Sequence, residues 1–240
     1  MKNQNNSSFE NAVIIGGSSS LGFEICNLFE KSSVNVISSY NINSPKKNNS
    51  IKRNLHLNLL DEESIRNFAD ELKSDFNKID ILIFLPGILP GKQLKNYDFS
   101  DIDEVMSVNF NGQAKLLLKI FSLLTSSSRI LLFSSISAQR GSFDPIYAAS
   151  KGALLSFTKS MAYQLPKGAR INSIAAGLIQ DSKMFNQMSV NRQEHHKGQI
   201  PSGSFLLKHD LAKIIFDLSQ KHWSHLNGAC IDLNGGQYVR

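Results

Sequence analysis

The chain is poor in cysteine and has no long apolar run. Its two cysteines, Cys26 and Cys230, stand far apart with no metal-ligand spacing around them, which argues against a disulfide-built scaffold and favours a reduced, intracellular protein. No stretch approaches the roughly 20 apolar residues of a membrane span, and residues 1–10 are polar, without the apolar core of a signal peptide. We therefore expect a cytoplasmic protein with no membrane partner and a flexible tail over residues 1–10.

A strong excess of one charge is also missing. The 26 basic and 20 acidic residues leave a net charge of +6, which is spread along the chain without a long run. Since no nucleic-acid-binding motif is recognisable, this pattern favours a solvated basic surface over a nucleic-acid partner. His195 and His196 are adjacent, so their side chains point in different directions, and we expect no metal site there.

What the chain does have is a regular alternation of short apolar runs and longer helical patterns. The apolar runs cover residues 12–15, 34–38, 55–57, 79–85, 129–134, 170–174 and 229–233. Between them, apolar residues recur at helical spacing over residues 21–31, 61–76, 102–124, 145–165 and 208–221. The alternation predicts a single α/β domain over residues 11–240, with a Rossmann-type, doubly wound, mostly parallel seven-stranded sheet and helices on both faces.

Two segments interrupt this alternation. Residues 41–54 form a polar stretch after the second apolar run and are predicted to be a loop. Residues 175–204 are too many for an ordinary connection, and Met184, Phe185 and Met188 give them an apolar face. Long loops of this kind are often active-site lids, so we predict a substrate lid around residues 178–206.

A glycine-rich turn follows the first apolar run. It reads Gly16-Gly17-Ser18-Ser19-Ser20-Leu21-Gly22 and opens a helical pattern. Gly16 allows a tight turn, and Gly22 allows close packing of the helix on the sheet. This placement suits a dinucleotide pyrophosphate at the helix N-terminus, although a plain turn with a serine cap would carry the same letters.

The feature with the most chemical content is Ser135, which stands ahead of Tyr147-Ala-Ala-Ser-Lys151. On a helix, residues four apart share one face, so the Lys151 ammonium can approach the Tyr147 phenol. A free phenol has a pKa near 10, and lowering it by about three units needs roughly 4 kcal/mol, the order of energy that a cation about 4 Å away supplies. We predict a proton-transfer site in which Ser135 holds a substrate oxygen beside the phenol.

A second Tyr-x-x-x-Lys in the chain serves as an internal control. Pro166 should end the helix between Tyr163 and Lys167, and no serine at the end of an apolar run precedes that pair. Residues 129–135, by contrast, read as a buried strand that delivers Ser135 at its carboxyl end, where open α/β sheets place ligands. The control therefore favours the first pair as the functional one.

Several motifs, in order, resemble the classical short-chain dehydrogenase/reductase family over residues 12–236. The series consists of Gly16-x-x-x-Ser20-x-Gly22, Asn58-Leu59, Val108-Asn109-Phe110-x-Gly112, Ser134-Ser135, Tyr147-x-x-x-Lys151, Asn172-Ser-Ile-Ala-Ala-Gly177 and Asn234-Gly235-Gly236. An ordered series of this length is far more specific than any one motif.

The resemblance implies a role for each of four polar side chains. Tyr147 is the general acid/base, and Lys151 lowers its pKa and holds the nicotinamide ribose. Ser135 orients the substrate oxygen, and Asn109 supports a water-linked proton path to Lys151. The implied reaction is the reversible, nicotinamide-dependent interconversion of a ketone and a secondary alcohol.

The resemblance also implies a set of cofactor-binding residues in the glycine-rich turn, at strand ends and near the lid. They are Gly16, Ser18, Ser19, Ser20, Leu21, Gly22, Ser39, Asn58, Leu59, Pro86, Gly87, Tyr147, Lys151, Gly177 and Ile179.

The chain departs from the family pattern mainly in its first half. Ser20 replaces the middle glycine of the turn, and Ile15 replaces a threonine. Residues 84–87, Phe-Leu-Pro-Gly, stand where the family has Asn-Asn-Ala-Gly, while Ala176 and Asn234 replace a proline and an aspartate. None of these changes falls on the four chemical positions, so we expect catalysis to survive.

The end of the second apolar run bears on the choice of cofactor. An acidic residue there would accept the 2′-hydroxyl of NAD, but residues 36–41 contain none. This absence favours NADP(H) over NAD(H). Lys46 and Lys47 are candidate partners of the 2′-phosphate, although solvated surface charges would be equally consistent with the sequence.

Together these features predict an NADPH-dependent reductase of a small-molecule carbonyl substrate, similar to the 3-oxoacyl-carrier-protein reductases. Two alternatives remain at this point: a dehydrogenase of a sugar or another secondary alcohol, and a non-catalytic dinucleotide-binding sensor or partner subunit. The family resemblance further implies a homotetramer or homodimer.

Overall fold

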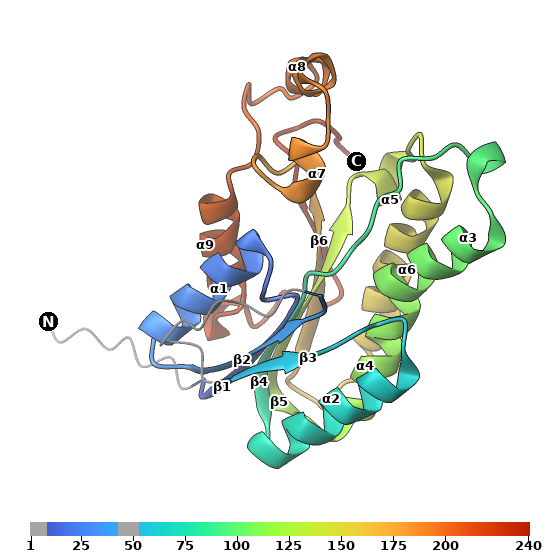
Figure 1. Ribbon diagram of the computed structural model, residues 1–240. Coiled ribbons are helices and arrows are strands. Elements are labelled where there is room, and N and C mark those ends of the chain that lie inside the picture. Colours follow the sequence, from blue (N-terminus) through green and yellow to red (C-terminus); the bar gives the residue numbers. More distant parts are fainter. Residues whose placement is uncertain (1–8, 43–52) are drawn as a thin grey trace, which may run out of the picture.

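One sheet with helices on both faces makes up the computed structural model, which describes residues 9–42 and 53–240 (Figure 1). Most of the predicted tail and polar loop, including Lys46 and Lys47, lies outside the described residues. All seven strands of the sheet are parallel and follow the order β3-β2-β1-β4-β5-β6-β7. The strands are β1 (Asn11–Ile15), β2 (Asn35–Tyr40), β3 (Arg53–His56), β4 (Ile79–Phe84), β5 (Leu124–Ser135), β6 (Arg170–Ala176) and β7 (Cys230–Leu233). The predicted doubly wound fold is confirmed.

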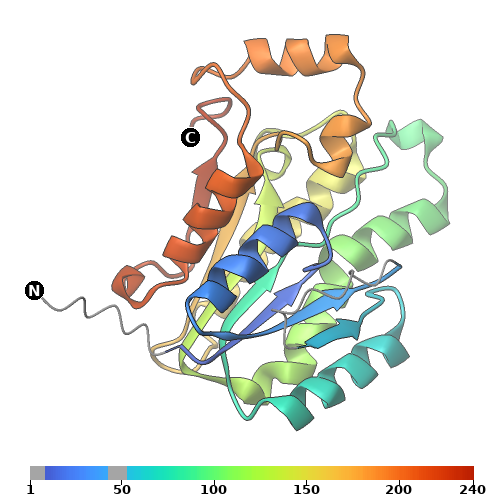
Figure 2. The ribbon, with the colours of Figure 1, turned by 60° about the vertical axis from the view of Figure 1, so that its left-hand side comes forward.

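The helices divide between the two faces of the sheet. The helices are α1 (Ser20–Lys31), α2 (Glu62–Asp75), α3 (Phe99–Met106), α4 (Gly112–Ile120), α5 (Ser137–Arg140), α6 (Pro145–Met161), α7 (Lys183–Asn186), α8 (Val190–Gly198) and α9 (Lys208–Leu218). Helices α1 and α9 pack together on one face, and α2, α4 and α6 cover the other (Figures 1 and 2). Among the described residues, no helix is both long and apolar enough to cross a bilayer.

Strand β1 shows why the core has two layers. All five of its residues are buried, and successive side chains of a strand point to opposite faces. Val13 and Ile15 accordingly join the core under α2, α4 and α6, whereas Ala12 and Ile14 join the core under α1 and α9. A central strand covered on both sides reads as a continuous apolar run, which is the pattern that the sequence shows.

The predicted helix over residues 102–124 is not continuous. It is divided into α3 and α4 by a π-helical turn, Ser107–Asn111. The turn adds a residue to the helical repeat and rotates the following face, which leaves Asn109 fully buried. Gly112 follows the turn, and a Cβ there would lie 2.4 Å from the Leu59 carbonyl oxygen, so only glycine lets this helix approach the β3–α2 connection.

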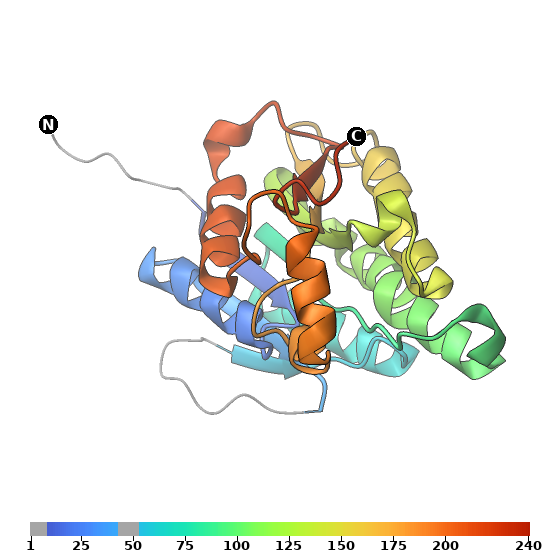
Figure 3. The ribbon, with the colours of Figure 1, turned by 90° about the horizontal axis from the view of Figure 1, so that it is seen from above.

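The segment predicted as a lid carries two helices of its own, α7 and α8. Seen from above, α8 crosses in front of the sheet (Figure 3), beyond the strand ends from which α5 and the glycine-rich turn emerge. These two helices are short, and α8 is mostly polar, so apolar periodicity does not predict them. Their N-caps are Ser182 and Ser189.

Candidate active site

A cavity of about 520 Å³ opens at the carboxyl ends of the strands. Its wall combines the glycine-rich turn, the ends of β4, β5 and β6, helix α6 and the predicted lid. Ser135, Tyr147 and Lys151, which the sequence singled out from two elements, all line it. The three groups are therefore brought together in one place.

Helix α6 delivers Tyr147 and Lys151 to this cavity. The helix begins with Asp144 as its N-cap and Pro145 in its first turn, a strong start signal. Tyr147 is 7% exposed and Lys151 is 3% exposed. The Lys151 ammonium donates to the carbonyl oxygens of Phe133 at 2.7 Å and Pro86 at 3.4 Å. Because burial disfavours the charged amine, the pKa of Lys151 is lowered to about 7.

The pKa of the Tyr147 phenol is shifted in the opposite direction to the sequence prediction. Burial raises its pKa, and the negative charge of Asp144 acts in the same direction, while a hydrogen bond with the Ser135 side chain opposes them. The predicted lowering of this pKa by Lys151 does not appear, and the Lys151 ammonium donates instead to two backbone carbonyls. The net effect favours the protonated form of the phenol.

The Asn109 side chain is held by the backbone of the loop after β4. Its Oδ1 accepts from the Ile88 N–H at 2.8 Å, and its Nδ2 donates to the Ile88 carbonyl at 3.0 Å and to the Ser150 hydroxyl at 2.9 Å. At Gly87, a Cβ would lie 2.8 Å from the Lys151 Nζ and 3.6 Å from the Asn109 Oδ1. Asn109 and Lys151 therefore converge on Gly87, which has no side chain to separate them.

Asp144 connects that loop to helix α6. Its buried carboxylate accepts from the backbone N–H groups of Gly91 at 2.8 Å and Tyr147 at 2.9 Å, and from the Tyr97 hydroxyl at 2.7 Å. Burial and Asp144 both raise the pKa of Tyr97, so that this hydroxyl remains a donor. The Asp-Pro pair signals a helix start in the sequence, but nothing there indicates the contact with a loop some fifty residues earlier.

The glycine-rich turn has the shape of a phosphate cradle. Gly16 has a φ of +83°, and a Cβ on Gly22 would lie 2.5 Å from the Gly16 carbonyl oxygen. Ser19 caps α1 by accepting from the Gly22 N–H at 3.0 Å. The left-handed φ of Gly16 disfavours any other residue there, and Gly22 has no room for a Cβ. These residues fit a dinucleotide pyrophosphate.

Ser20 and Ser39 occupy different places around this cradle. Ser20, the residue in place of the family's middle glycine, is exposed and lines the cavity, so its side chain lies in open space. Ser39 is buried, and its hydroxyl accepts from the Gly16 N–H at 2.8 Å. The first residue faces the cavity, and the second supports the turn from behind.

The full set of predicted cofactor residues divides into those that line the cavity and those that do not. Those that line the cavity are Ser19, Ser20, Leu21, Gly87, Tyr147, Lys151, Gly177 and Ile179. Those outside its lining are Gly16, Ser18, Gly22, Ser39, Asn58, Leu59 and Pro86. The Asn58 Oδ1 accepts from the Leu60 N–H at 3.1 Å, an arrangement that shapes the β3–α2 connection.

The predicted lid contributes apolar and cationic side chains. Met184 and Met188 line the cavity, whereas Phe185 packs on Phe205 with ring centroids 5.1 Å apart. Arg192 and His196 of α8 also line it, together with Arg140 at the end of α5. No sequence pattern indicated that these three side chains share a cavity, because α5 and α8 are distant in the chain.

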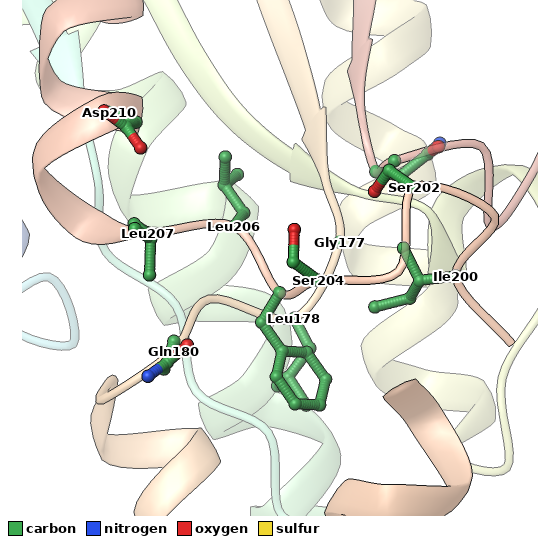
Figure 4. A pocket seen from close by; sticks show the side chains of 12 residues that line it. Gly177, Leu178, Gln180, Ile200, Ser202, Ser204, Leu206, Leu207 and Asp210 are labelled. Carbon is green, nitrogen blue, oxygen red and sulfur yellow. The ribbon is translucent and has the colours of Figure 1, made fainter. Parts of the chain in front are cut away.

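A second cavity, of about 270 Å³, lies behind Gly177 and Leu178, which line both cavities. Figure 4 shows its other walls, among them Ile200 and Ser202 after α8 and Asp210 of α9. Tyr147 and Lys151 do not line it. The predicted catalytic residues Ser135, Tyr147 and Lys151 therefore lie at the larger cavity.

Comparison with known proteins agrees with this geometry. The model of a family described as enoyl-(acyl carrier protein) reductase matches residues 16–237. A 3-oxoacyl-(acyl-carrier-protein) reductase of Buchnera aphidicola is 30% identical over 241 residues, covering 95% of this chain and 97% of that protein. Its counterpart from Aquifex aeolicus is 30% identical over 188 residues, covering 77% and 75%. The solved structure of a short-chain dehydrogenase/reductase from Brucella melitensis, titled a glucose/ribitol dehydrogenase, superposes with a TM-score of 0.87 at 24% identity, covering 97% and 98%.

Proposed function

The chain belongs to the short-chain dehydrogenase/reductase family, and from that premise we propose that it is an NADPH-preferring reductase of a 3-oxoacyl-type carbonyl substrate. Family membership makes it an NAD(P)-dependent oxidoreductase that acts on CH–OH and C=O groups. The observation that carries the proposed carbonyl chemistry is the meeting of Ser135, Tyr147 and Lys151 in one cavity with the phosphate cradle.

In the proposed reaction, a bound nicotinamide dinucleotide supplies the hydride. Tyr147 donates the proton that the nascent alkoxide takes up. Burial makes the phenol a weaker acid, but an alkoxide is a much stronger base than a phenolate, so the transfer remains favourable. The Ser135 hydroxyl holds the substrate oxygen beside it. Lys151, with a pKa lowered to about 7, can release and regain a proton near neutral pH, and Asn109 fixes the loop over the Lys151 ammonium.

The preference for NADPH rests on the end of β2. Its last three residues, Ser38, Ser39 and Tyr40, include no carboxylate to accept a ribose 2′-hydroxyl or repel a 2′-phosphate. The names of the Buchnera and Aquifex relatives support a 3-oxoacyl thioester as the substrate. Residues 178–206 act in this proposal as the lid over that substrate.

A homotetramer or homodimer is part of the same proposal. Phe99 of α3, Leu118 of α4 and Tyr163 after α6 are 88%, 74% and 91% exposed, although such side chains are usually buried. Size-exclusion chromatography with light scattering measures the assembly directly, and a monomer at micromolar concentration would contradict this part of the proposal.

The test begins with fluorescence titration of the purified protein with NADPH and NADH. We expect a lower dissociation constant for NADPH, and equal constants would refute the preference. Oxidation of NADPH is then followed as 3-oxoacyl thioesters, diketones and keto sugars are added. Turnover of the thioesters supports the proposal, faster turnover of keto sugars supports a sugar dehydrogenase, and binding without turnover of any of them favours a sensor or partner subunit.

A further inference from the structure

The charged side chains around the larger cavity are all basic. Among the described residues, Arg140, Lys151, Lys183 and Arg192 line it, and no aspartate or glutamate does. Acidic residues are not scarce in the chain, which has 20 of them against 26 basic ones. A lining of one sign in a partly enclosed space concentrates positive potential there.

None of these four cations has a carboxylate partner in the part of the chain that the structure describes. The Arg140 guanidinium donates only to the Gln237 carbonyl, at 3.5 Å, and Arg192 forms no ion pair. Other arginines do find acids: Arg53 pairs with Glu71, and Arg240 pairs with Asp232 at 2.9 Å. The guanidiniums at the cavity therefore retain donors for a ligand.

These side chains meet although they come from separate elements. The pKa of His196 is lowered by burial and then by the positive charges of Arg192, His195 and Arg140. All three side chains line the larger cavity, Arg140 from the end of α5 and Arg192 and His196 from the first and last turns of α8. We define Arg140 and Arg192, together with the neutral imidazole of His196, as the cationic cluster.

The position of the cationic cluster points to the substrate rather than the cofactor phosphates. Arg140 lies five residues after Ser135, the predicted holder of the substrate oxygen. The phosphate cradle is at the start of α1, and Figure 1 shows α1 and α5 on either side of β6. Phe143, Met184 and Met188 line the same cavity and supply an apolar wall.

We propose that the cationic cluster binds an anionic group, a carboxylate or a phosphate, of an otherwise apolar carbonyl substrate. The inference rests on the proposed function, since it assigns the substrate class of the same cavity. Arginine suits this task because its planar fork matches both anions and stays charged.

A binding experiment tests the cluster without requiring turnover. Isothermal titration of the protein saturated with NADP⁺ compares octanoate with octanamide, which has the same chain and no charge. We expect octanoate to bind about tenfold to a hundredfold more tightly, the range for a charge-assisted hydrogen bond. Arg140→Gln and Arg192→Gln should each remove most of that difference. Lys197→Gln removes one charge from α8 outside the cavity and should preserve it.

A kinetic experiment distinguishes the two sources of the anion. The ratio of kcat/KM for 3-oxooctanoate to that for its methyl ester measures recognition of a carboxylate. The ratio for the 3-oxooctanoyl thioesters of phosphopantetheine and pantetheine measures recognition of a phosphate. Arg192→Gln should lower one of these ratios about tenfold or more, and that ratio identifies the source.

Three results would overturn the inference. These are equal affinity for octanoate and octanamide, no binding of either, and arginine variants that leave the binding difference intact. Failure of the proposed function looks different, because preferential octanoate binding that depends on the arginines, combined with no turnover of any ketone, would retain the anion site and remove the reductase.

Discussion

The two halves of the sheet follow the family pattern to different degrees. In the first half, β1 to β4, the chain replaces a glycine of the turn and the Asn-Asn-Ala of residues 84–86. In the second half, β5 and α6 retain Ser135, Tyr147 and Lys151. The difference separates positions where the backbone supplies the interaction from positions where a side-chain atom does.

Pro86 shows how the first half tolerates change. Its carbonyl oxygen accepts from the Lys151 ammonium at 3.4 Å and from the Gln113 amide at 3.2 Å. Any residue offers that carbonyl, so the side chain can vary while the contact with Lys151 persists. At Tyr147 no backbone atom can replace the phenol. Sequence divergence in the first half is therefore compatible with a working site.

The largest expected effect comes from a substitution in the second half of the sheet that leaves the first half unchanged. Tyr147→Phe removes the phenolic proton but keeps the ring, so we expect kcat to fall about 10²- to 10⁴-fold, the range of general acid catalysis. The NADPH dissociation constant should change less than about twofold, because the phosphate cradle is untouched. Stopped-flow oxidation and fluorescence titration measure the two quantities. Tyr163→Phe is the matched control, and an active Tyr147→Phe would mean that another group donates the proton.

A pH-dependent stability test examines Lys151 itself. Its pKa is about 7 in the folded chain, below the ordinary value of about 10.4, so the unfolded chain binds the additional proton between these values. Stability therefore rises with pH across that window, and below pH 7 the buried charge destabilises the fold by a constant amount. Lys151→Met removes this term.

We expect Lys151→Met to gain roughly 2–4 kcal/mol more in unfolding free energy, relative to the parent, at pH 6.5 than at pH 9.5. Urea denaturation at both pH values measures it. A difference that is the same at both pH values would show that Lys151 is charged throughout the range, held so by the carbonyls of Phe133 and Pro86.

The next largest effect is expected from a substitution in the glycine-rich turn of the first half. Gly22→Ala adds a Cβ 2.5 Å from the Gly16 carbonyl oxygen and 2.6 Å from the Gly17 Cα, and backbone must move to admit it. We expect a loss of about 1–3 kcal/mol in unfolding free energy and an NADPH dissociation constant raised about tenfold or more by the displaced cradle. Gly198→Ala, where a Cβ meets nothing within 4 Å, is the control. Unchanged NADPH affinity in Gly22→Ala would mean that the turn does not bind the phosphates.

The sequence predicted what depends on local spacing. The doubly wound sheet follows from alternating periodicity, and the convergence of Ser135 with Tyr147 and Lys151 follows from a strand end and one turn of helix. The π-helical turn at Ser107–Asn111 could not be predicted, because the contact that Asn109 makes there, with Ser150, joins residues 41 positions apart in the chain.

Features that depend on the three-dimensional surroundings of a residue could not be predicted from the sequence either. The direction of the Tyr147 pKa shift depends on how much burial outweighs neighbouring charges, which spacing alone does not give. The cationic cluster joins Arg140 to Arg192 and His196 across more than fifty residues of chain. Helices α7 and α8 lack a strong apolar period, so their caps were the only local signal.

The smallest expected effect tests whether the departures of the first half from the family pattern weaken cofactor binding. Ser20 is the first residue of α1, and its exposed side chain lies at the cavity rather than against the turn. Ser20→Gly restores the family residue, yet we expect the NADPH dissociation constant to change by less than about threefold, because the backbone N–H groups at this helix start are the same for both residues. A tenfold tighter complex in Ser20→Gly would instead show that the hydroxymethyl group obstructs the phosphate. The first half would then bind the cofactor weakly, and turnover by the catalytic residues of the second half would be limited by cofactor occupancy.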